Sequence, residues 1–405
     1  MSQNIVYDQC SSLQGLYLAV DLGGTNFRVC SIQLHGNTTF SLTQSKVAVP
    51  HSLMTAPTSK DLFSFLAKQI ETFLQTHHND HYSAHLERRQ NPTNKNDKEE
   101  EEVFQMGFTF SFPVNQNSIN SGTLVRWTKG FDIPDAIDQD VCQLLQAEID
   151  ALGLPVKVAA LVNDTVGTLM ARSYTSPGKT GTLLGAIFGT GTNGAYVEKL
   201  SRVHKIKDRG GYDNSTGDMI INTEWGSFDN HLSTLPNTPY DAGLDAGSNN
   251  PGIQMFEKRV SGMFLGEVLR RALLSLVNDP KTSLFSDADS STNDEHSTTT
   301  IDANSALYKV WGVDTSFLSI VQADGSPGYS ATRQALAKDL GVDAASAEDA
   351  EAVKILVDAI GKRGARLSAV AIAAVVIATE NHVPKEGAEE DVVSKFPSFY
   401  VFGSF

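Results

Sequence analysis

The chain has 405 residues, enough for two domains with well-filled cores, and its 40% apolar and 20% charged residues are ordinary for a globular protein. Its formal net charge of -15 argues against nucleic acid or anionic membranes as partners, because both require clustered cations. Cys10, Cys30 and Cys142 are too few and too scattered for a disulfide framework, so we expect free thiols in a reducing compartment. The N-terminus lacks a secretory signal, and the longest apolar run, residues 369–378, is about half the roughly 20 residues of a membrane span. These features predict a cytoplasmic protein without membrane insertion.

Residues 16–32 predict a strand, a glycine turn and a second strand, and residues 183–197 repeat the pattern. The first turn is Leu22-Gly23-Gly24-Thr25-Asn26, and the second is Gly189-Thr190-Gly191-Thr192-Asn193. This weak internal repeat, with helical stretches between its copies, favours two related α/β halves that face each other across a cleft.

Both turns have the chemistry of a phosphate-binding loop, because glycines let backbone N–H groups approach phosphate oxygens and threonine adds a hydroxyl donor. Two such loops could hold the two ends of a polyphosphate. Neither matches the P-loop or the G-x-G-x-x-G pattern, which disfavours a P-loop kinase or a dehydrogenase. Asp21 precedes the first turn and would repel phosphate unless Mg²⁺ lay between them; the alternative is a turn-forming carboxylate.

Helical periodicity is expected at residues 60–76, 135–152, 163–174 and 346–379, and the alanine-rich stretch 369–379 is interpreted as a buried, closely packed helix. The polar segments 77–102 and 286–303 are interpreted as loops or disordered insertions. The first contains His77, His78, His81 and His85, but carboxylates at regular spacing are missing. A solvated surface is therefore favoured there over a metal site.

Residues 106–131 predict an apolar strand that gives way to hydroxyls, amides and one cation. Phe108, Phe110 and Phe112 alternate with small residues, and Pro113 ends the strand because it lacks a ladder donor. Trp127-Thr128-Lys129-Gly130-Phe131 then places an ammonium beside a hydroxyl between aromatic residues. Taken singly, these segments are typical of a core strand and a strand-to-loop junction; together they indicate a sugar pocket.

Further polar residues follow apolar strands downstream. Asn163 and Asp164 open a helix after VKVAALV, so they are either a plain helix cap or a general base that accepts a proton from an attacking hydroxyl. Glu224 stands between an apolar strand and Trp225, and Glu257 stands at a helix start, where the helix dipole alone could explain it. Two carboxylates with neighbouring amides suit a polyol, since each accepts from two hydroxyls.

The ordered series LAVDLGGTNFRV, GFTFSFP, WTKGF, NDTVGTL, GTGTN, NTEWGSF and NPGIQMFEKRVSGMFLGEVLR resembles the motifs of the hexokinase family, and most of all those of fungal glucokinases and hexokinases. The resemblance covers about residues 16–379. It implies a two-lobed, actin-like (ribonuclease H-like) α/β ATPase fold with a central cleft, in which sugar binding closes the lobes. It also implies a small lobe over residues 1–162 and a large lobe over 163–405.

The resemblance implies phosphorylation of glucose, with other hexoses as further substrates, at the 6-hydroxyl with ATP and Mg²⁺, the first step of glycolysis. Asp164 would be the base, and Lys129 would stabilise the transferring phosphoryl charge. The implied hexose ligands are Ser111, Thr128, Lys129, Asn163, Asp164, Asn193, Glu224 and Glu257. The implied phosphate and Mg²⁺ residues are Asp21, Gly23, Gly24, Thr25, Asn26, Arg28, Gly189, Thr190 and Gly191, with Asp21 nearest the metal.

Both ends depart from the family pattern. About 15 residues precede the first expected strand, where the family has a longer segment, and after Glu380 there is no match to the family's G-x-D-G-S loop or its closing strand and helix. Two alternatives to a working kinase therefore stay open. One is a catalytically weak or inactive sugar sensor; the other, an actin-like chaperone or filament ATPase, leaves the FSFP, WTKGF and NTEWG motifs unexplained. The sequence leaves the oligomeric state open.

Overall fold

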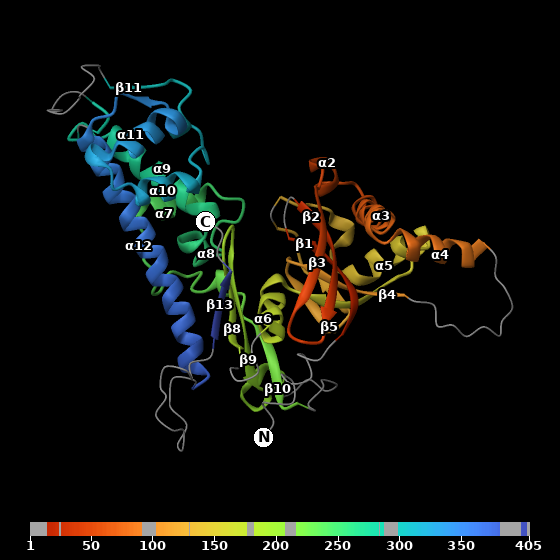
Figure 1. Ribbon diagram of the computed structural model, residues 1–405. Helices are drawn as coiled ribbons and strands as arrows, with labels where there is room; N and C mark the ends of the chain where they lie inside the picture. The colour runs from red at the N-terminus through yellow and green to blue at the C-terminus, as the bar shows by residue number, and fades with distance from the viewer. Residues whose placement is uncertain are drawn as a thin grey trace. The chain divides into compact units, whose positions relative to one another are not determined.

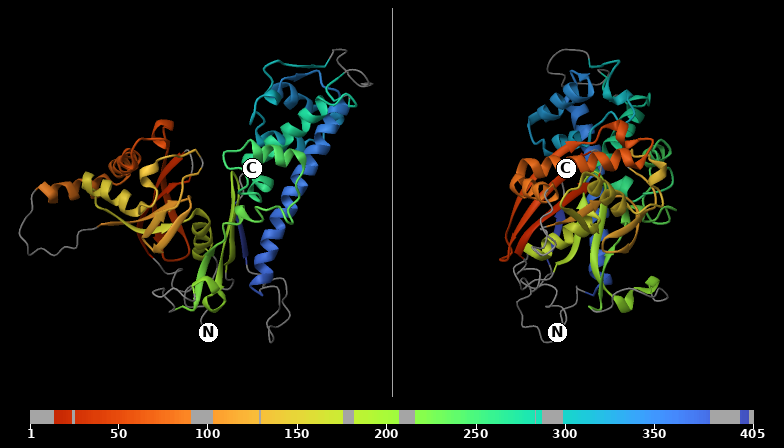
Figure 2. Two further views of the ribbon diagram at one scale, coloured as in Figure 1. Left: turned by 180° about the vertical axis from the view of Figure 1, so that it is seen from behind. Right: turned by 90° about the vertical axis from the view of Figure 1, so that its right-hand side faces the viewer.

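The chain forms two compact units, Met1–Thr182 and Leu183–Phe405 (Figure 1; Figure 2). The computed structural model describes residues 14–23, 26–90, 103–128, 130–175, 182–206, 216–282, 284–286 and 299–380, together with the backbone of 398–402. The lobe boundary expected at residues 162/163 concerns the lobes of the hexokinase family and stays a prediction.

The first unit is built on a five-stranded sheet with the order β3-β2-β1-β4-β7. Its strands are β1 (Gln14–Leu22), β2 (Asn26–His35), β3 (Phe40–Ala48), β4 (Phe104–Phe110) and β7 (Val156–Val162). The strands on both sides of the first glycine turn are thus confirmed, and they pair antiparallel. Because β1, β4 and β7 run parallel, their carboxyl ends meet at one edge, with Leu22 opposite Phe110 and Thr109 opposite Val162.

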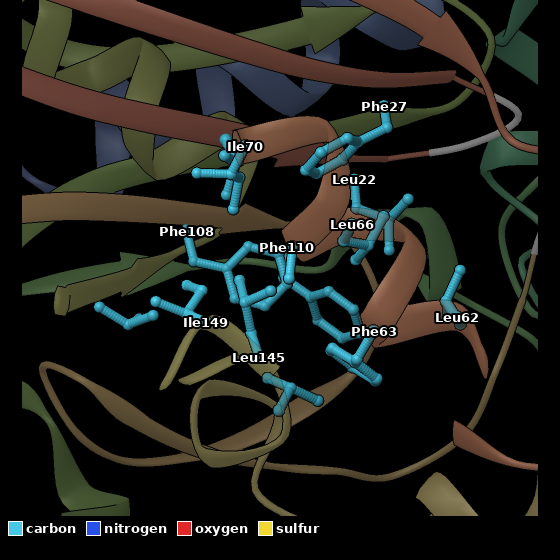
Figure 3. Close-up of a cluster of buried hydrophobic side chains, with 14 of the residues drawn as sticks. Leu22, Phe27, Leu62, Phe63, Leu66, Ile70, Phe108, Phe110, Leu145 and Ile149 are labelled. Carbon is cyan, nitrogen blue, oxygen red and sulfur yellow. The ribbon is translucent and has the colours of Figure 1, made fainter. Parts of the chain in front are cut away.

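Two amphipathic helices, α3 (Ser59–His77) and α5 (Val141–Leu152), bury their apolar faces against this sheet. Figure 3 shows the resulting core, in which Phe108 and Phe110 of β4 lie among side chains of both helices. Each such buried side chain stabilises the unit by about 1.5–3 kcal/mol. The other elements are α2 (His51–Met54), α4 (Asn79–Gln90), α6 (Asp164–Thr175), β5 (Val114–Ser118), β6 (Ser121–Leu124) and the 3-10 helix Pro134–Ala136.

Two expectations are corrected in this unit. The helix expected from residue 135 begins at Val141, because Asp138 has a left-handed φ of 62° and Asp140 caps the helix by accepting from the N–H groups of Cys142 and Gln143. The segment expected as a loop from residue 77 is helical in α4.

The polar helix α4 packs on the core through Tyr82 and Leu86, one turn apart, and is held further by side-chain hydrogen bonds. The hydroxyl of Tyr82 donates to Glu71 Oε1 at 2.8 Å, and Nε2 of His85 lies 2.8 Å from the carbonyl oxygen of Gly153. Acidic Asp80 in the first turn and Arg88 and Arg89 in the last turn complement the helix dipole. Residues 91–102 of the expected loop lie outside the described residues.

The second unit combines a four-stranded sheet, in the order β10-β9-β8-β13, with a helical part. The strands are β8 (Thr182–Phe188), β9 (Thr192–Lys199), β10 (Asp218–Asn222) and β13 (Ser398–Phe402), and β11 (Thr300–Ile301) pairs with β12 (Val342–Asp343). The helices are α7 (Pro239–Ala246), α8 (Glu257–Val260), α9 (Gly262–Val277), α10 (Thr315–Ala323), α11 (Ser330–Ala335) and α12 (Ala347–Ala378), with a π-helical turn at Leu336–Leu340. Short 3-10 helices are Leu200–Arg202, His204–Ile206, Trp225–Ser227, Ala306–Tyr308 and Pro327–Tyr329.

The long helix α12 runs along the second unit (Figure 1) and starts with a capping box between Ser346 and Asp349. Its C-terminal part is not the buried helix expected from its alanine content, because Val370 and Ile377 are 63% and 60% exposed. Among the described residues, this part of α12 packs on the core through a stripe that includes buried Val375. Within the described residues, no helix has the length and apolarity to cross a membrane.

Candidate active site

The first glycine turn lies beside β4, at the edge of the sheet where β1 and β4 end. Arg28 on β2 faces Asp21 across the antiparallel pair, and its Nη1 donates to Asp21 Oδ2 at 2.7 Å. The N–H of Ser111 donates to the carbonyl oxygen of Leu22 at 3.2 Å. A Cβ atom added to Gly23 would lie 3.3 Å from Ser111 Oγ and 3.4 Å from Asp21 Oδ1. The structure thus brings Asp21, Gly23 and Ser111 together, while Gly24 and Thr25 lie outside the described residues.

Aromatic packing ties the second polar segment to the first. The ring of Trp127 meets Phe112 edge-on with centroids 5.0 Å apart and stacks on Phe131 at 5.4 Å. Its Nε1 donates to the carbonyl oxygen of Ile133 at 2.8 Å, which satisfies the buried indole. Because Ser111 precedes Phe112 and Thr128 follows Trp127, this cluster places both hydroxyls on neighbouring segments. Lys129 lies outside the described residues.

Asn163 and Asp164 stand one step beyond β7, where α6 begins. Oδ1 of Asn163 accepts from the N–H of Thr165 at 2.9 Å, so Asn163 does serve as a helix cap. Oδ1 of half-buried Asp164 accepts from the same N–H at 2.8 Å and from the Thr165 hydroxyl at 3.2 Å. Its Oδ2 has no hydrogen-bond or ion-pair partner in the described part of the chain.

The second glycine loop, Gly189-Thr190-Gly191, connects β8 and β9 as the repeat predicts. Its carbonyl oxygens face the start of α9: Gly262 N–H donates to Gly189 at 2.8 Å, and Met263 N–H donates to Thr190 at 3.2 Å. The loop is thereby fixed to the first turn of that helix.

Asn193 organises a polar network around Glu224. Its Oδ1 accepts from the backbone N–H groups of Gly194 and Glu224 at 2.8 and 3.0 Å, so its Nδ2 is directed at Asn222 Oδ1 and Glu224 Oε1, at 2.7 and 3.2 Å. Nδ2 of Asn222 also donates to Glu224 Oε1 at 2.9 Å. Glu224 itself has a left-handed backbone, with φ 49°, which this network holds in place.

Asn222 belongs to the same polar network, and the sequence does not single it out as a candidate. It ends β10 within the NTEWG motif, but its type alone is common at strand ends. The spacing to Glu224, two residues on, was the available signal.

Glu257 lies against the second glycine loop. Its Oε2 accepts from the N–H of Thr192 at 2.8 Å, and a Cβ atom on Gly191 would come within 2.6 Å of the same oxygen. Trp225 also holds Thr192 in place, because its Nε1 donates to the Thr192 hydroxyl at 2.9 Å. The structure thus groups Gly191, Asn193, Glu224 and Glu257 in the second unit.

Among the described residues, no group of three or more His, Cys, Asp and Glu side chains could hold a metal ion. Asp21 therefore offers one carboxylate, already paired with Arg28. Cys30 and Cys142 are free thiols; burial, with a smaller effect of Asp140, raises the pKa of Cys142 to about 12, so that this thiol is not a nucleophile.

Comparison with known proteins agrees with this arrangement. Two hexokinase family profiles match the chain, over residues 7–174 and 183–401. A glucokinase of Aspergillus niger is 59% identical over 392 residues, which cover 95% of this chain and 77% of the relative. Glucokinase-1 of Saccharomyces cerevisiae is 40% identical over 409 residues, covering 95% and 76%. A hexokinase from Schistosoma mansoni, solved in complex with glucose, has a TM-score of 0.70 at 32% identity and covers 92% of this chain and 74% of its own.

The two α/β units, each with a glycine loop between antiparallel strands, define a kinase of the actin-like class. The chain belongs to the hexokinase family. The family, the actin-like α/β fold class and the hexokinase/glucokinase type of enzyme predicted from the sequence are therefore confirmed, and membership of a kinase family implies the use of ATP.

Proposed function

We propose that this chain transfers the γ-phosphoryl group of ATP to the 6-hydroxyl of glucose, with other hexoses as weaker substrates. The observation that carries the proposal is the Asp164 carboxylate at the start of α6, two residues after β7, with Oδ1 fixed by Thr165 and Oδ2 left for a ligand. The sugar oxygen attacks the γ-phosphorus, its proton passes to Asp164, and the bond to the β-phosphate oxygen breaks to release ADP.

The remaining residues have binding and electrostatic roles in this proposal. Ser111, Thr128, Asn163, Asn193, Glu224 and Glu257 hold the sugar hydroxyls, and Lys129 both contacts the sugar and offsets the charge of the moving phosphoryl group. The glycine turns, with Thr25, Asn26 and Arg28, hold phosphate oxygens. Mg²⁺, when bound beside Asp21, offsets the negative charge of the phosphates, and a carboxylate oxygen aimed at the turn is a ligand type that Mg²⁺ accepts. A cytoplasmic location fits the free thiols.

The test is formation of glucose-6-phosphate by the purified chain with Mg-ATP and glucose, beside the Asp164→Ala variant as a control for contaminating host kinase. Product formation that is lost in the variant supports the proposal. If neither protein forms product but calorimetry shows heat on adding glucose, the chain is a sugar sensor. If glucose gives no heat either, the chain is neither a glucose kinase nor a glucose sensor, and the sugar site is wrongly assigned.

Asn222→Ala should raise the KM for glucose about threefold to tenfold with little change in kcat, because Glu224 loses the shorter of the two amide hydrogen bonds that orient its carboxylate. The measurement is initial rate against glucose concentration. Asn120→Ala, at an exposed turn after β5, is the control and should leave both constants unaltered. A glucose KM equal to that of the parent protein would remove Asn222 from the site.

A further inference from the structure

Glu257 is assigned to the sugar in the proposed function, but its side chain contacts the second glycine loop, which the same proposal assigns to phosphate. Its Oε2 accepts the N–H of Thr192, the residue directly after Gly189-Thr190-Gly191, at 2.8 Å. The contact is close-fitting: a Cβ atom at Gly191 would stand 2.6 Å from Oε2, well inside van der Waals distance. One carboxylate oxygen of Glu257 therefore lies directly against Gly191 and Thr192.

The residues that follow Glu257 hold the same loop from its carbonyl side. The carbonyl oxygen of Glu257 accepts from the N–H of Ser261 at 3.0 Å, which closes the turn into α9. The next two residues, Gly262 and Met263, donate to the carbonyl oxygens of Gly189 and Thr190. A Cβ atom on Gly262 would lie 3.2 Å from the Gly189 oxygen, so the approach is tight here too. The segment from Glu257 to Met263 therefore hydrogen-bonds both to the N–H group that follows the loop and to two carbonyl oxygens within it.

The other sugar carboxylate makes no such contact. The described hydrogen bonds of the Glu224 side chain go to Asn193 and Asn222, and none goes to the loop 189–192. Glu224 and Glu257 are thus two acidic residues with the same proposed partner and different neighbours. This difference allows one of them to serve as a control for the other.

We propose that Glu257 is a positioning residue of the phosphate loop as well as a sugar ligand, so that it sets nucleotide affinity even when no sugar is bound. This inference rests on the proposed function. A charge-assisted hydrogen bond is shorter and stronger than a neutral one, and here it fixes the backbone N–H of Thr192 at the end of the loop. The Gly189 N–H donates within the loop to the Gly191 carbonyl oxygen at 2.9 Å, so the phosphate role falls to the N–H groups of Thr190 and Gly191. A loop that is already ordered binds phosphate without a further loss of conformational entropy.

The experiment compares Glu257→Gln with Glu224→Gln in the full chain. Affinity for a non-hydrolysable ATP analogue with Mg²⁺ is measured by calorimetry without sugar, and affinity for glucose is measured without nucleotide. We expect both variants to bind glucose more weakly, whereas only Glu257→Gln should bind the analogue about tenfold more weakly. Glu224→Gln should keep the parent affinity for the analogue within about twofold.

Three outcomes would overturn the inference or its basis, and they are distinguishable. Equal analogue affinity in Glu257→Gln and the parent protein, with glucose affinity reduced, overturns the positioning role and leaves the proposed function intact. Equal loss of analogue affinity in both variants shows that the effect does not pass through the Thr192 contact and also overturns it. Unaltered glucose affinity in both variants would contradict the sugar site itself.

Thermal unfolding of each variant distinguishes a local effect from loss of the fold. If Glu257→Gln is not folded, Glu257→Asp decides the question, because it keeps the charge but shortens the side chain by one methylene and so removes the contact with Thr192. A folded Glu257→Asp protein with the parent affinity for the analogue would rule the inference out.

Discussion

Asp164→Ala should lower turnover by about 10²-fold or more while leaving the unfolding temperature nearly unaltered. General-base catalysis contributes roughly 10²–10⁴-fold, because the base accepts the proton of the attacking hydroxyl and also aligns that hydroxyl. The fold should survive since Asn163 Oδ1 also accepts the N–H of Thr165, so α6 keeps a cap without Asp164. The measurement is kcat from glucose-6-phosphate formation at saturating glucose and Mg-ATP.

Asp164→Asn is the matched variant, because it retains the shape and the hydrogen-bond acceptor for Thr165 but cannot take up a proton. Its kcat should fall as far as that of the alanine variant, with glucose affinity within a few-fold of the parent protein. If either variant kept turnover within about threefold of the parent, Asp164 would be a helix-start residue and the base would have to be sought elsewhere.

The sequence could predict the parts of the site that depend on local pattern. The two strand-turn-strand units can be predicted because apolar residues recur at every second position in the strands on both sides of each glycine turn. The position of Ser111 followed from the end of a strand marked by Pro113, although β4 ends at Phe110 and Phe112 belongs to the aromatic cluster beyond it. Asn163 and Asp164 were found because they follow an apolar strand directly.

Contacts between residues distant in the chain could not be predicted in this way. The bond from Thr192 to Glu257 spans 65 positions, and the pairing of Asn193 with Asn222 spans 29. The exposed face of α12 was missed because alanine and valine fit a buried and an exposed helix equally well. The sequence does not predict α4 because only Tyr82 and Leu86 mark its buried side, and its other contacts, with Glu71 and Gly153, are with residues distant in the chain or on another helix.

Glu267→Gln should destabilise the second unit by about 3–5 kcal/mol, the usual cost of breaking a buried ion pair from one side. Glu267 is 1% exposed on α9 and accepts from Arg270 Nε and Nη2 at 2.6 Å each, from Arg271 Nε at 2.8 Å and from the N–H of Trp311 at 2.9 Å. The neutral amide would leave Arg270 buried without a countercharge. Because α9 also holds the second glycine loop through Met263, loosening should reduce nucleotide affinity as well.

The same substitution should also weaken the pH dependence of the free energy of unfolding at acid pH. Burial acts to raise the pKa of Glu267, but the hydrogen bonds from Arg270 and Trp311 and the charges of both arginines outweigh it and hold the pKa below its ordinary value of 4.5. The stabilisation is therefore complete above the unfolded-state pKa and is lost as pH falls through the lower folded-state value. Part of this pH dependence should remain in the variant, because Asp241 contributes in the same way. Burial acts to raise the pKa of Asp241, but its hydrogen bonds with Arg363 and Thr238 outweigh burial and lower the pKa.

Chemical denaturation at neutral pH and again below pH 4.5 measures both effects, with Asp358→Asn as the control. Asp358 forms an i,i+4 pair with Lys354 at 3.8 Å, but its side chain is 43% exposed, so its loss should cost less than about 1 kcal/mol. Similar unfolding free energies for Glu267→Gln and Asp358→Asn would mean that the buried network contributes no more than a surface pair. The size of this effect matters for function, because α9 carries both Glu267 and Met263. Met263, in the first turn of the helix, holds the second glycine loop.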